Sequence, residues 1–528
     1  MKFLNWLSQA AISHPEAIAL SFKSNLIDQE IDQEIDQGLN QRDLNWSYAQ
    51  LETLARHWAW QLQKLGLKTG DRLGILLNNH PRYLILIHAL AKCGVIGVFL
   101  NTRLTDLEIT WQLRDSNTNY LVYDGATTIT AIAVTKQIEN LNIIDLSHWS
   151  ITSLATESID LQTNSQSDLQ NNWLDFEQIQ GIFYTSGTTG KPKAVPLTYG
   201  NHYHSAIAST MRIASYVDDN WLVCMPMFHV GGLAIAWRSV INGTKITLLP
   251  KFDEQLVLDA IAGEQVTLIS LVPTMLIRLL KHPQCQKLQK SQKLRGILLG
   301  GASANAQLIS QCLELKLPIM PTYGMTETAS QITTLLPTEL NFKIGSAGLP
   351  LWGIEIKIVD LQNIKQELPT GAIGQILVRG ANVMAGYFNS MGNRSSNQEW
   401  FSTGDLGYLD SDRYLYVVNR RHDLIVSGGE NIYPSEVEAV LCQHPAIAEV
   451  CVIGLDDQEW GAIVAAAIVL KRSQDHQLSL HAIRSFCEEQ GLSRYKLPKS
   501  VYFVDDLPKS ASGKILRQEL IRGLRDVC

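Results

Sequence analysis

The sequence contains no block of clustered lysines and arginines. It holds 44 Lys and Arg against 51 Asp and Glu, so its formal net charge is −7. Affinity for a nucleic acid comes mainly from basic side chains that neutralise many phosphates, and a mildly acidic chain lacks that surplus. The charge balance therefore predicts that no nucleic acid is a partner.

Cysteines at metal-binding spacing are also missing. None of the 8 cysteines falls in a Cys-x-x-Cys pair or beside clustered histidines. A structural zinc site needs such clusters, and a disulfide framework is typical of short secreted chains. We therefore expect neither kind of site, and we expect a reducing, cytoplasmic location.

No uninterrupted apolar run is long enough for a membrane span. A transmembrane helix needs about 20 apolar residues, whereas the longest stretch, residues 84–100, includes His88, Lys92 and two glycines. This stretch instead predicts a buried helix that leads into a buried strand. The first residues of the chain reach polar side chains too early for a signal peptide, so we expect no leader.

What the sequence does contain is an alternation of helical and strand patterns. Leu51, Leu54 and Trp58 recur at helical spacing, and strand-like runs at 72–77 and 95–100 flank a helical run at 83–93. Such alternation predicts an α/β fold of parallel-rich sheets flanked by helices. Further strands are expected at 221–225, 245–249, 267–272, 296–299 and 355–359.

The length and the pattern together predict two unequal domains. At roughly 100–200 residues per domain, 528 residues provide ample core for more than one domain. We expect a large α/β body over residues 1–419, a hinge at 420–423, and a small mobile α+β lid over 424–528. A four-residue repeat at 27–38 and a polar segment at 151–175 are interpreted as surface loops.

The stretch from Thr185 to Lys193 has the composition of a phosphate-binding loop. It follows an apolar strand expected at 179–183 and reads Thr-Ser-Gly-Thr-Thr-Gly-Lys-Pro-Lys. Glycines let backbone N–H groups approach an anion, hydroxyls donate to its oxygens, and lysines supply charge. The spacing between Gly187 and Gly190 is too short for the nucleotide loop of kinases and GTPases. A plain polar strand-to-helix turn is the alternative.

Three further stretches carry side chains that suit a nucleotide. Residues 321–329 combine an aromatic ring for a base, a threonine for a phosphate and Glu327 for Mg²⁺. Asp405 follows a glycine and suits two ribose hydroxyls, although a turn or a helix cap would explain it equally well. Lys514 lies in a Ser- and Gly-rich loop, which in isolation is ordinary surface.

Together these stretches resemble the adenylate-forming superfamily, which contains acyl-CoA synthetases, luciferases and the adenylation domains of peptide synthetases. The resemblance extends from Tyr48 to Lys514, with the separated motifs in the family's order. It implies a two-step reaction, in which ATP activates a carboxylate as an acyl-adenylate and the thiol of CoA then displaces AMP. It also implies that the chain uses ATP, Mg²⁺ and CoA.

The resemblance assigns roles to residues that are far apart in the chain. It implies that Lys514, Glu327 and Thr185 are catalytic, with Lys514 bridging the carboxylate and the α-phosphate and Glu327 holding the metal. The loop would hold the β- and γ-phosphates, the aromatic ring would stack on adenine, and Asp405 would bind ribose. The implied nucleotide ligands are Thr185, Ser186, Gly187, Thr188, Thr189, Gly190, Lys191, Lys193, Gly300, Gly301, Ala302, Tyr323, Gly324, Thr326, Asp405 and Arg420.

The second step needs a different face of the lid. The stretch Gly428, Gly429, Glu430 and Asn431 resembles the loop that approaches the CoA channel after the lid rotates. Arg421 and His422 are the implied hinge residues, although family members usually have Asp or Lys where His422 stands. A histidine there would make rotation sensitive to pH near neutrality, or it is simply exposed and without consequence.

Several stretches are similar to one group within the superfamily, the o-succinylbenzoate–CoA ligases of menaquinone and phylloquinone synthesis. They are residues 101–104, 198–202, 228–232, 237–240 and 323–332. The acid of that group has a second carboxylate, and Arg238, in an otherwise apolar run, is its expected partner. The alternatives for Arg238 are a surface position or a structural ion pair. The other candidates for the acid pocket are His202, which is equally a packed core histidine, His229, Ser303 and Thr274.

Other interpretations stay open at this point. The same chemistry could act on another aryl or medium-chain acid. An adenylation enzyme that loads a carrier protein is less favoured, because no carrier segment with its attachment serine follows Lys514. A relative that only binds nucleotide is disfavoured by the presence of the acidic and basic residues named above. The sequence does not determine the oligomeric state.

Overall fold

The computed structural model of the protein covers most of the chain. The repeat at 27–38 and most of the expected connector at 151–175 lie outside the described residues. The described residues are 2–22, 44–149, 151, 172–185, 192–302, 304, 306–388, 399–420, 423–427, 430–457, 460–471, 478–490, 492, 494–510, 513 and 515–525.

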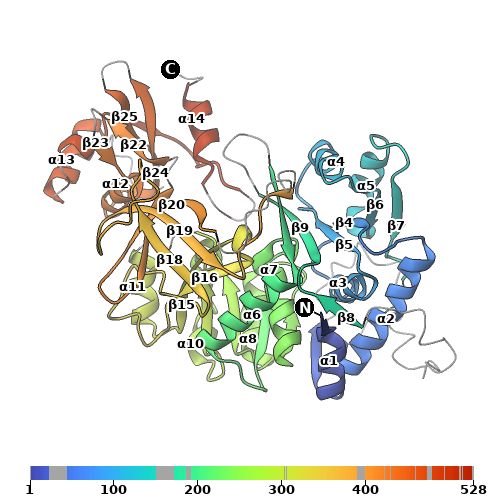
Figure 1. The fold of residues 1–528 in the computed structure, drawn as a ribbon. Helices are drawn as coiled ribbons and strands as arrows, with labels where there is room; N and C mark the ends of the chain where they lie inside the picture. Colours follow the sequence, from blue (N-terminus) through green and yellow to red (C-terminus); the bar gives the residue numbers. More distant parts are fainter. Residues whose placement is uncertain are drawn as a thin grey trace.

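A six-stranded sheet forms one side of the body, to the right in Figure 1. Its strands are, in spatial order, β10 (Lys193–Thr198), β9 (Ile179–Thr185), β5 (Ile96–Phe99), β4 (Arg72–Leu76), β6 (Tyr120–Tyr123) and β7 (Asn142–Asp145). All neighbours run parallel except β10 and β9, which form an antiparallel hairpin. The central strands are apolar on both faces, as expected for a parallel sheet that is covered on both sides.

A nine-stranded sheet forms the second layer of the body. Its strands are, in spatial order, β17 (Leu349–Pro350), β16 (Ser330–Thr334), β15 (Ile319–Met325), β14 (Gly296–Leu299), β13 (Leu268–Leu271), β11 (Asn220–Val223), β12 (Lys245–Leu248), β2 (Ile18–Phe22) and β3 (Leu44–Ser47). From β15 to β2 all neighbours are parallel, and antiparallel strands close both edges. The parallel strands predicted between residues 221 and 299 are therefore confirmed as neighbours in one sheet.

A group of helices shares one apolar core with both sheets. They are α1 (Trp6–Ser13), α2 (Tyr48–Lys64), α3 (Pro81–Cys93), α6 (Tyr199–Ile213) and α7 (Val230–Asn242). All residues of α3 are buried. Pro81 begins this helix at a position that needs no backbone N–H, and Gly94 ends it with a φ of 70°. The buried helix and strand predicted at 84–100 are confirmed.

The outer faces of the two sheets are covered by other helices. Those on the six-stranded sheet are α4 (Asp106–Asp115) and α5 (Thr128–Thr135), which follows the short 3₁₀ turn η2 (Gly125–Thr127). Those on the nine-stranded sheet are α8 (Glu254–Gly263), α9 (Pro273–Lys281), α10 (Gln286–Lys290) and α11 (Ala306–Glu314). Each sheet is thus wrapped on both faces, which confirms the predicted α/β class.

Antiparallel strands complete the body. A four-stranded sheet packs its apolar side chains with residues of α6 and β16, and its strands are β18 (Ile354–Val359), β19 (Gly374–Gly380), β20 (Phe401–Leu409) and β21 (Leu415–Arg420). A small pair joins β1 (Lys2–Leu4) to β8 (Trp173–Asp175). The alternative of a turn or helix cap at Asp405 is wrong, because this residue lies within β20.

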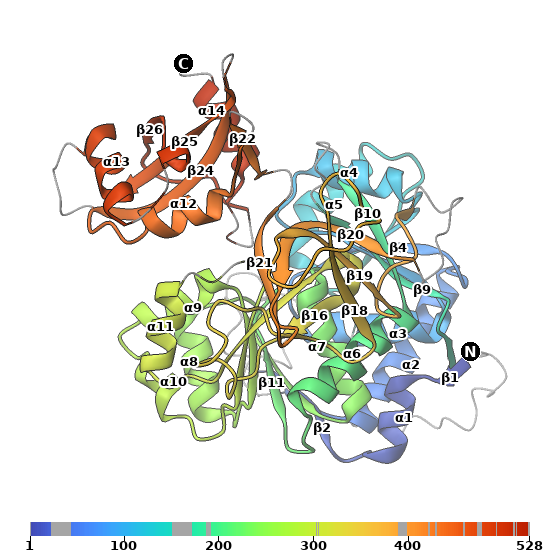
Figure 2. The ribbon, with the colours of Figure 1, turned by 60° about the vertical axis from the view of Figure 1, so that its left-hand side comes forward.

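The C-terminal part of the chain forms a separate α+β unit beside the lobe of α8 to α11 (Figure 2). Its apolar cores lie on both faces of a three-stranded sheet. Its elements are β22 (Ile425–Ser427), β23 (Glu430–Ile432), α12 (Pro434–Leu441), β24 (Ile447–Asp457), β25 (Gly461–Leu470), α13 (Leu480–Glu489), η6 (Arg494–Lys496), β26 (Ser500–Phe503) and α14 (Arg517–Arg525). A small C-terminal α+β unit was predicted, and its hinge and limits stay a prediction.

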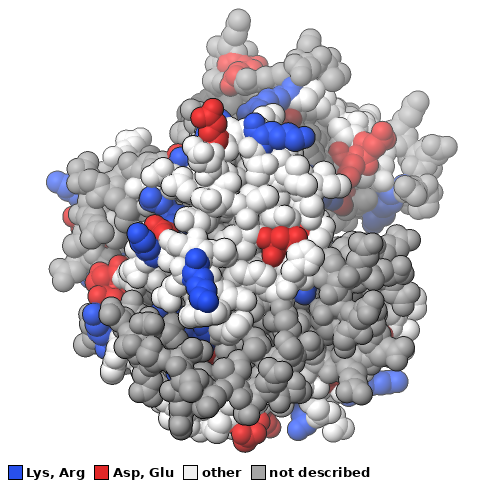
Figure 3. Space-filling view, turned by 90° about the vertical axis from the view of Figure 1, so that its right-hand side faces the viewer, with Lys and Arg blue, Asp and Glu red and all other residues white. Residues whose placement is uncertain are grey.

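The charged side chains of both signs are dispersed on the face that lies to the right in Figure 1. Figure 3 shows basic and acidic residues interspersed there among uncharged ones. Within the described ranges, no helix has both the length and the apolar character needed to cross a bilayer.

A buried ion pair joins the first three helices. Lys92 of α3 donates to Glu52 of α2, with Nζ 2.9 Å from Oε1, and to Oγ of Ser8 in α1 at 2.9 Å. Both charged side chains are almost inaccessible to water. Arg56 also contacts Glu52 at 2.6 Å, but a third of its side chain is exposed. Since a buried charge is costly without its partner, losing one member of this pair should destabilise the packing of α1, α2 and α3.

We predict that Lys92→Met lowers the free energy of unfolding by about 3–5 kcal/mol, because it leaves the Glu52 carboxylate buried without its main cation. Urea denaturation followed by tryptophan fluorescence would measure this loss. Arg56→Ala removes the more exposed cation from the same carboxylate and is the matched control, with an expected loss of about 1 kcal/mol or less. Equal losses in the two variants would contradict the argument.

Candidate functional site

The expected phosphate-binding loop connects two antiparallel strands. Thr185 ends β9, Lys193 begins β10, and the two residues are register partners across the hairpin. The strand-to-helix alternative is therefore wrong. The remaining predicted loop residues, Ser186, Gly187, Thr188, Thr189, Gly190 and Lys191, lie outside the described residues.

Glu327 lies close to the base of this hairpin. It belongs to a single 3₁₀ turn, η3 (Thr326–Thr328), between β15 and β16, and its side chain is 6% exposed. The hydroxyl of Tyr387 donates to Oε1 of Glu327 at 3.1 Å. Lys193 Nζ lies 4.9 Å from the centre of the Tyr387 ring. The aromatic ring of Tyr387 thus connects the hairpin base with the carboxylate.

The turn around Glu327 depends on an unusual backbone. Ala329 and Ser330 have φ values of 50° and 100°, and Ala329 N–H donates to the carbonyl of Thr326 at 3.0 Å. A Cβ at Gly324 would lie 1.7 Å from the carbonyl oxygen of Ser330, so no other residue fits there without moving the backbone. Gly324, one of the expected nucleotide ligands, thus allows the close approach of β15 and β16.

Tyr323 and Asp405 meet although they come from different sheets. The hydroxyl of Tyr323 donates to Oδ2 of Asp405 at 2.6 Å. Asp405 is 7% exposed, and its own N–H donates to Oγ1 of Thr403 at 3.1 Å. Arg420 of β21 is the register partner of Asp405, and its side chain lies outside the described part of the structure.

The predicted glycine-rich strand end lies next to the same motif. Gly300 follows β14, whose last residue is the register partner of Pro321 in β15. A Cβ at Gly300 would lie 2.8 Å from Cγ2 of Thr322, and Gly301 has a φ of 79°. Gly301 and Ala302 are exposed. Because these are carboxyl ends of neighbouring parallel strands, this edge of the sheet is where α/β proteins bind ligands.

Arg238 lies on α7 and is 3% exposed, which excludes the surface alternative. Its guanidinium carbon lies 4.9 Å from the centre of the Trp221 ring, and Nη2 is 3.5 Å from Oγ of Ser330. Among the residues that the structure describes, neither Nε nor Nη1 has a hydrogen-bond partner. Burial lowers the pKa of Arg238 to about 10, so the group is still charged at neutral pH. A buried cation therefore lies beside the segment that follows Glu327.

The two candidate histidines are neutral at physiological pH. His202 is buried on α6 between the rings of Phe183 and Trp237, and burial lowers its pKa to about 3. His229 precedes α7 and is partly accessible to solvent. Desolvation of its imidazole by the surrounding residues, with a smaller effect of the Arg103 charge, lowers its pKa to about 4. Neither imidazole can therefore offer a positive charge to a carboxylate near pH 7.

One predicted pocket residue contacts the C-terminal unit. Thr274 is exposed on α9, and a Cβ at Gly513 would lie 2.6 Å from its Oγ1. Gly513 has a φ of 77°, which favours glycine. The chain just before Lys514 therefore lies against the body at Thr274. Lys514 and Ser303 themselves lie outside the described residues.

The structure describes only part of the predicted hinge and CoA loop. Arg421, His422, Gly428 and Gly429 lie outside the described residues. The backbones of Glu430 and Asn431 form β23, where Glu430 is the register partner of Ser427 in a tight hairpin. Near the expected hinge, Oγ of Ser435 donates to the carbonyl of Val418 at 2.7 Å.

Residues that the sequence did not point to hold the site together. Tyr387 carries no motif of its own, and only its contacts with Lys193 and Glu327 reveal it. Asn201 lies in the stretch 198–202, yet its function is structural, because Nδ2 donates to the carbonyls of Ala381 and Val383 at 3.0 Å. Asn201 therefore fixes the segment before Tyr387 against α6.

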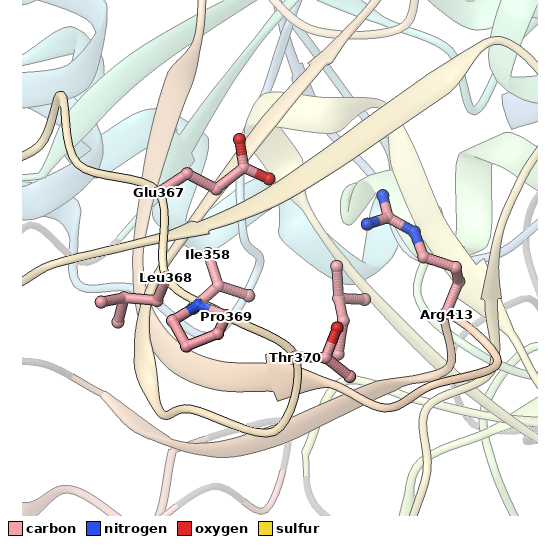
Figure 4. Close-up of a pocket in the computed structure, with 7 residues that line it drawn as sticks. Ile358, Glu367, Leu368, Pro369, Thr370 and Arg413 are labelled. Atoms are coloured by element: carbon pink, nitrogen blue, oxygen red, sulfur yellow. The ribbon is translucent and has the colours of Figure 1, made fainter.

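A separate hollow of about 410 Å³ lies on the four-stranded sheet (Figure 4). It is lined by Ile358, Leu409, Arg413 and residues 367–370, none of which belongs to the predicted site. Arg413 there donates to the carbonyl of Ile356 at 3.2 Å. The cluster around Glu327 and Asp405, rather than this hollow, contains the predicted chemistry.

Known proteins are similar to this chain over nearly its whole length. The family model "AMP-binding enzyme" matches residues 7–388, and "AMP-binding enzyme C-terminal domain" matches residues 436–514. The 2-succinylbenzoate–CoA ligase of Bacillus cereus (strain Q1) is 39% identical over 518 residues, which is 98% of each chain.

Solved structures with bound ligands are similar to this chain. The o-succinylbenzoate CoA synthetase of Bacillus subtilis in complex with its acyl-adenylate intermediate has a TM-score of 0.83 and 37% identity, covering 98% of each chain. The same enzyme in complex with ATP and magnesium ion also has a TM-score of 0.83 and 37% identity, over 98% of this chain and 100% of that one.

Proposed function

We propose that this chain, which belongs to the AMP-binding enzyme family, is an ATP-dependent acid–CoA ligase that acts on 2-succinylbenzoate. The observation that carries this proposal is the similarity over 98% of the chain to a ligase of that specificity. The product is then 2-succinylbenzoyl-CoA, an intermediate of menaquinone and phylloquinone synthesis. A cytoplasmic location is part of this proposal, and the free cysteines among the described residues are compatible with it.

The reaction couples two displacements. In the first, a carboxylate oxygen of the acid attacks the α-phosphorus of ATP, the bond to the β-phosphate breaks, and pyrophosphate leaves. In the second, the sulfur of CoA attacks the acyl carbon, the bond to the AMP oxygen breaks, and AMP leaves. The first step brings two anions together, so the protein's contribution is mainly positive charge and positioning.

The hairpin base and Glu327 suit the triphosphate. Thr185 and Lys193 place a hydroxyl and a cation where the loop leaves β9 and returns to β10. Glu327 is a buried carboxylate beside this hairpin and would hold Mg²⁺, which supplies charge to the phosphate oxygens. Thr326, next to Glu327 in the same turn, would contact the α-phosphate.

Tyr323, Asp405 and the end of β14 suit the nucleoside. The hydroxyl of Tyr323 holds the Asp405 carboxylate, which would accept hydrogen bonds from the ribose hydroxyls. The ring of Tyr323 would stack on adenine, and residues 300–302, of which Gly301 and Ala302 are exposed, would form the opposite wall. The hydrogen bond thus couples recognition of the base with recognition of the sugar.

Arg238 suits the second carboxylate of the acid. A buried guanidinium needs a partner, and two of its nitrogens have none among the described residues. Trp221 and Arg238 both line a cavity of about 10 Å³, which has room for roughly one water. The aromatic ring of 2-succinylbenzoate therefore cannot enter this cavity. We infer that the carboxylate approaches Arg238 from the side of Ser330.

The contact between Gly513 and Thr274 suits the first step. It places the residue before Lys514 against the body, as adenylation requires if Lys514 bridges the two reacting anions. Rotation about residues 420–423 would then bring the loop of residues 428–431 toward the site for the second step. The body at 1–419 and the lid at 424–528 are the two rigid parts of this proposal.

The proposed substrate is tested by acid-dependent exchange of pyrophosphate with ATP. We expect 2-succinylbenzoate to support exchange, and benzoate, coumarate and a medium-chain fatty acid to support about a hundredfold less, because they lack one of the two carboxylates. Rapid exchange with one of the other acids, and none with 2-succinylbenzoate, would show that the specificity is wrong while the family chemistry holds.

Arg238→Ala should raise the KM for 2-succinylbenzoate about 10- to 100-fold and leave the KM for ATP unchanged, because one charged hydrogen-bond partner is lost. 4-Oxo-4-phenylbutanoate lacks the ring carboxylate, so the variant should no longer prefer 2-succinylbenzoate over it. Arg212→Ala, on α6, is the control for loss of an arginine, because it breaks an ion pair with Glu339. A parallel rise in both KM values would argue against a substrate contact.

Lys514→Ala should slow adenylate formation about 100- to 1,000-fold, since a cation is lost from the reacting phosphate. Thioester formation from supplied acyl-adenylate should change only a few-fold, because the lid presents another loop in that step. Single-turnover assays of the two half-reactions separate these effects. Lys509→Ala, in the same loop but paired with Glu449 at 2.6 Å, is the control. Equal slowing of both half-reactions would refute this division of roles.

A further inference from the structure

We propose that Tyr387 is a positioning residue of the adenylation site, whose hydroxyl orients the carboxylate of Glu327 toward the metal-bound nucleotide. The inference rests on the proposed use of Mg·ATP and not on the identity of the acid. Tyr387 comes from the segment between β19 and β20, 60 residues from Glu327 in sequence. No motif in the sequence points to it.

The hydrogen bond acts on the softest part of the Glu327 side chain. The last torsion of a glutamate has a broad, roughly two-fold energy profile, so the carboxylate plane is free to turn unless a donor holds it. The Tyr387 hydroxyl is such a donor, with its oxygen 3.1 Å from Oε1. A phenol carries its proton at neutral pH, so the Tyr387 hydroxyl can donate this hydrogen bond.

Tyr387 is held through its ring and through the segment before it. Lys193 Nζ lies 4.9 Å from the centre of the ring, within the range of a cation–π contact, and joins it to the base of the hairpin. In the preceding segment, the N–H of Met384 donates to the carbonyl of Glu327 at 2.8 Å, and Nδ2 of Asn382 donates to the carbonyl of Thr328 at 2.9 Å. The segment before Tyr387 is therefore attached to the turn that carries Glu327.

These contacts give one residue two connections that matter for Mg·ATP. A group that orients a metal-binding side chain commonly changes metal affinity 10- to 100-fold when it is removed. The same ring contacts Lys193, which belongs to the phosphate-binding hairpin. Tyr387 thus couples the position of the metal-binding carboxylate to the position of the hairpin.

The test compares ATP binding by calorimetry in excess Mg²⁺ and in EDTA. Tyr387→Phe removes the hydroxyl but keeps a ring beneath Lys193. We expect its ATP affinity in Mg²⁺ to fall about tenfold, while its affinity in EDTA stays within about twofold of the wild type. A purely structural role would lower both affinities together, so the ratio of the two is the informative quantity.

Tyr184→Phe is the matched control. Its hydroxyl also donates to a carboxylate, Oδ2 of Asp115 at 2.9 Å, and it belongs to the same hairpin, in β9. We expect the ratio of the two ATP affinities to stay at the wild-type value. In a Glu327→Gln background, Tyr387→Phe should cause no further change in the ratio, because the group that it orients has been altered.

Each outcome has a distinct meaning. An unchanged ratio in Tyr387→Phe, or an equal drop in the Glu327→Gln background, would overturn the role of Tyr387 and leave the proposed function intact. A wild-type chain that binds no ATP in Mg²⁺ would overturn both. Failure of 2-succinylbenzoate as a substrate would overturn the proposed specificity alone, because the binding test contains no acid.

Discussion

A carboxylate and a triphosphate repel each other, and this repulsion is the constraint that the proposed site has to meet. The groups proposed to meet it come from separate segments: the hairpin residues Thr185 and Lys193, the buried carboxylate Glu327, which would act through the Mg²⁺ that it holds, and the Tyr323–Asp405 pair, which would position the nucleoside. Because charge acts most strongly where water is excluded, the burial of Glu327 and Asp405 is as important as their chemical type.

The fold supplies these groups at the margins of its sheets. The hairpin of β9 and β10 closes one edge of the six-stranded sheet, and β15 and β16 meet near the edge of the nine-stranded sheet. Tyr387 connects the two, since it contacts Lys193 on one side and Glu327 on the other. The parallel cores are rigid and covered on both faces, so small polar turns at their margins can be held in fixed positions.

Local patterns predicted the elements well, because the signals for a helix or strand lie within the element itself. The proline at the start of α3 and the glycine after it are neighbours of the apolar run that they bound. The sequence left alternatives open for the polar segments, and only strand pairing excluded them. The loop after β9 leads into a strand and not a helix, and Asp405 lies within a strand, because β9 pairs with β10 and β20 pairs with β19 and β21.

The sequence by itself determined the chemistry: the types of residue in each motif, their order, and the family to which the chain belongs. Only the tertiary structure decided which side chains meet, because contacts such as Tyr387–Glu327 and Tyr323–Asp405 join residues 60 and 82 positions apart. The tertiary structure also decided that Arg238 is buried, because its neighbours in sequence are compatible with either a surface or a core position. The burial and the partners of a side chain depend on how distant segments pack. The local period of 3.6 residues shows which face of a helix is apolar but not which segment packs against that face.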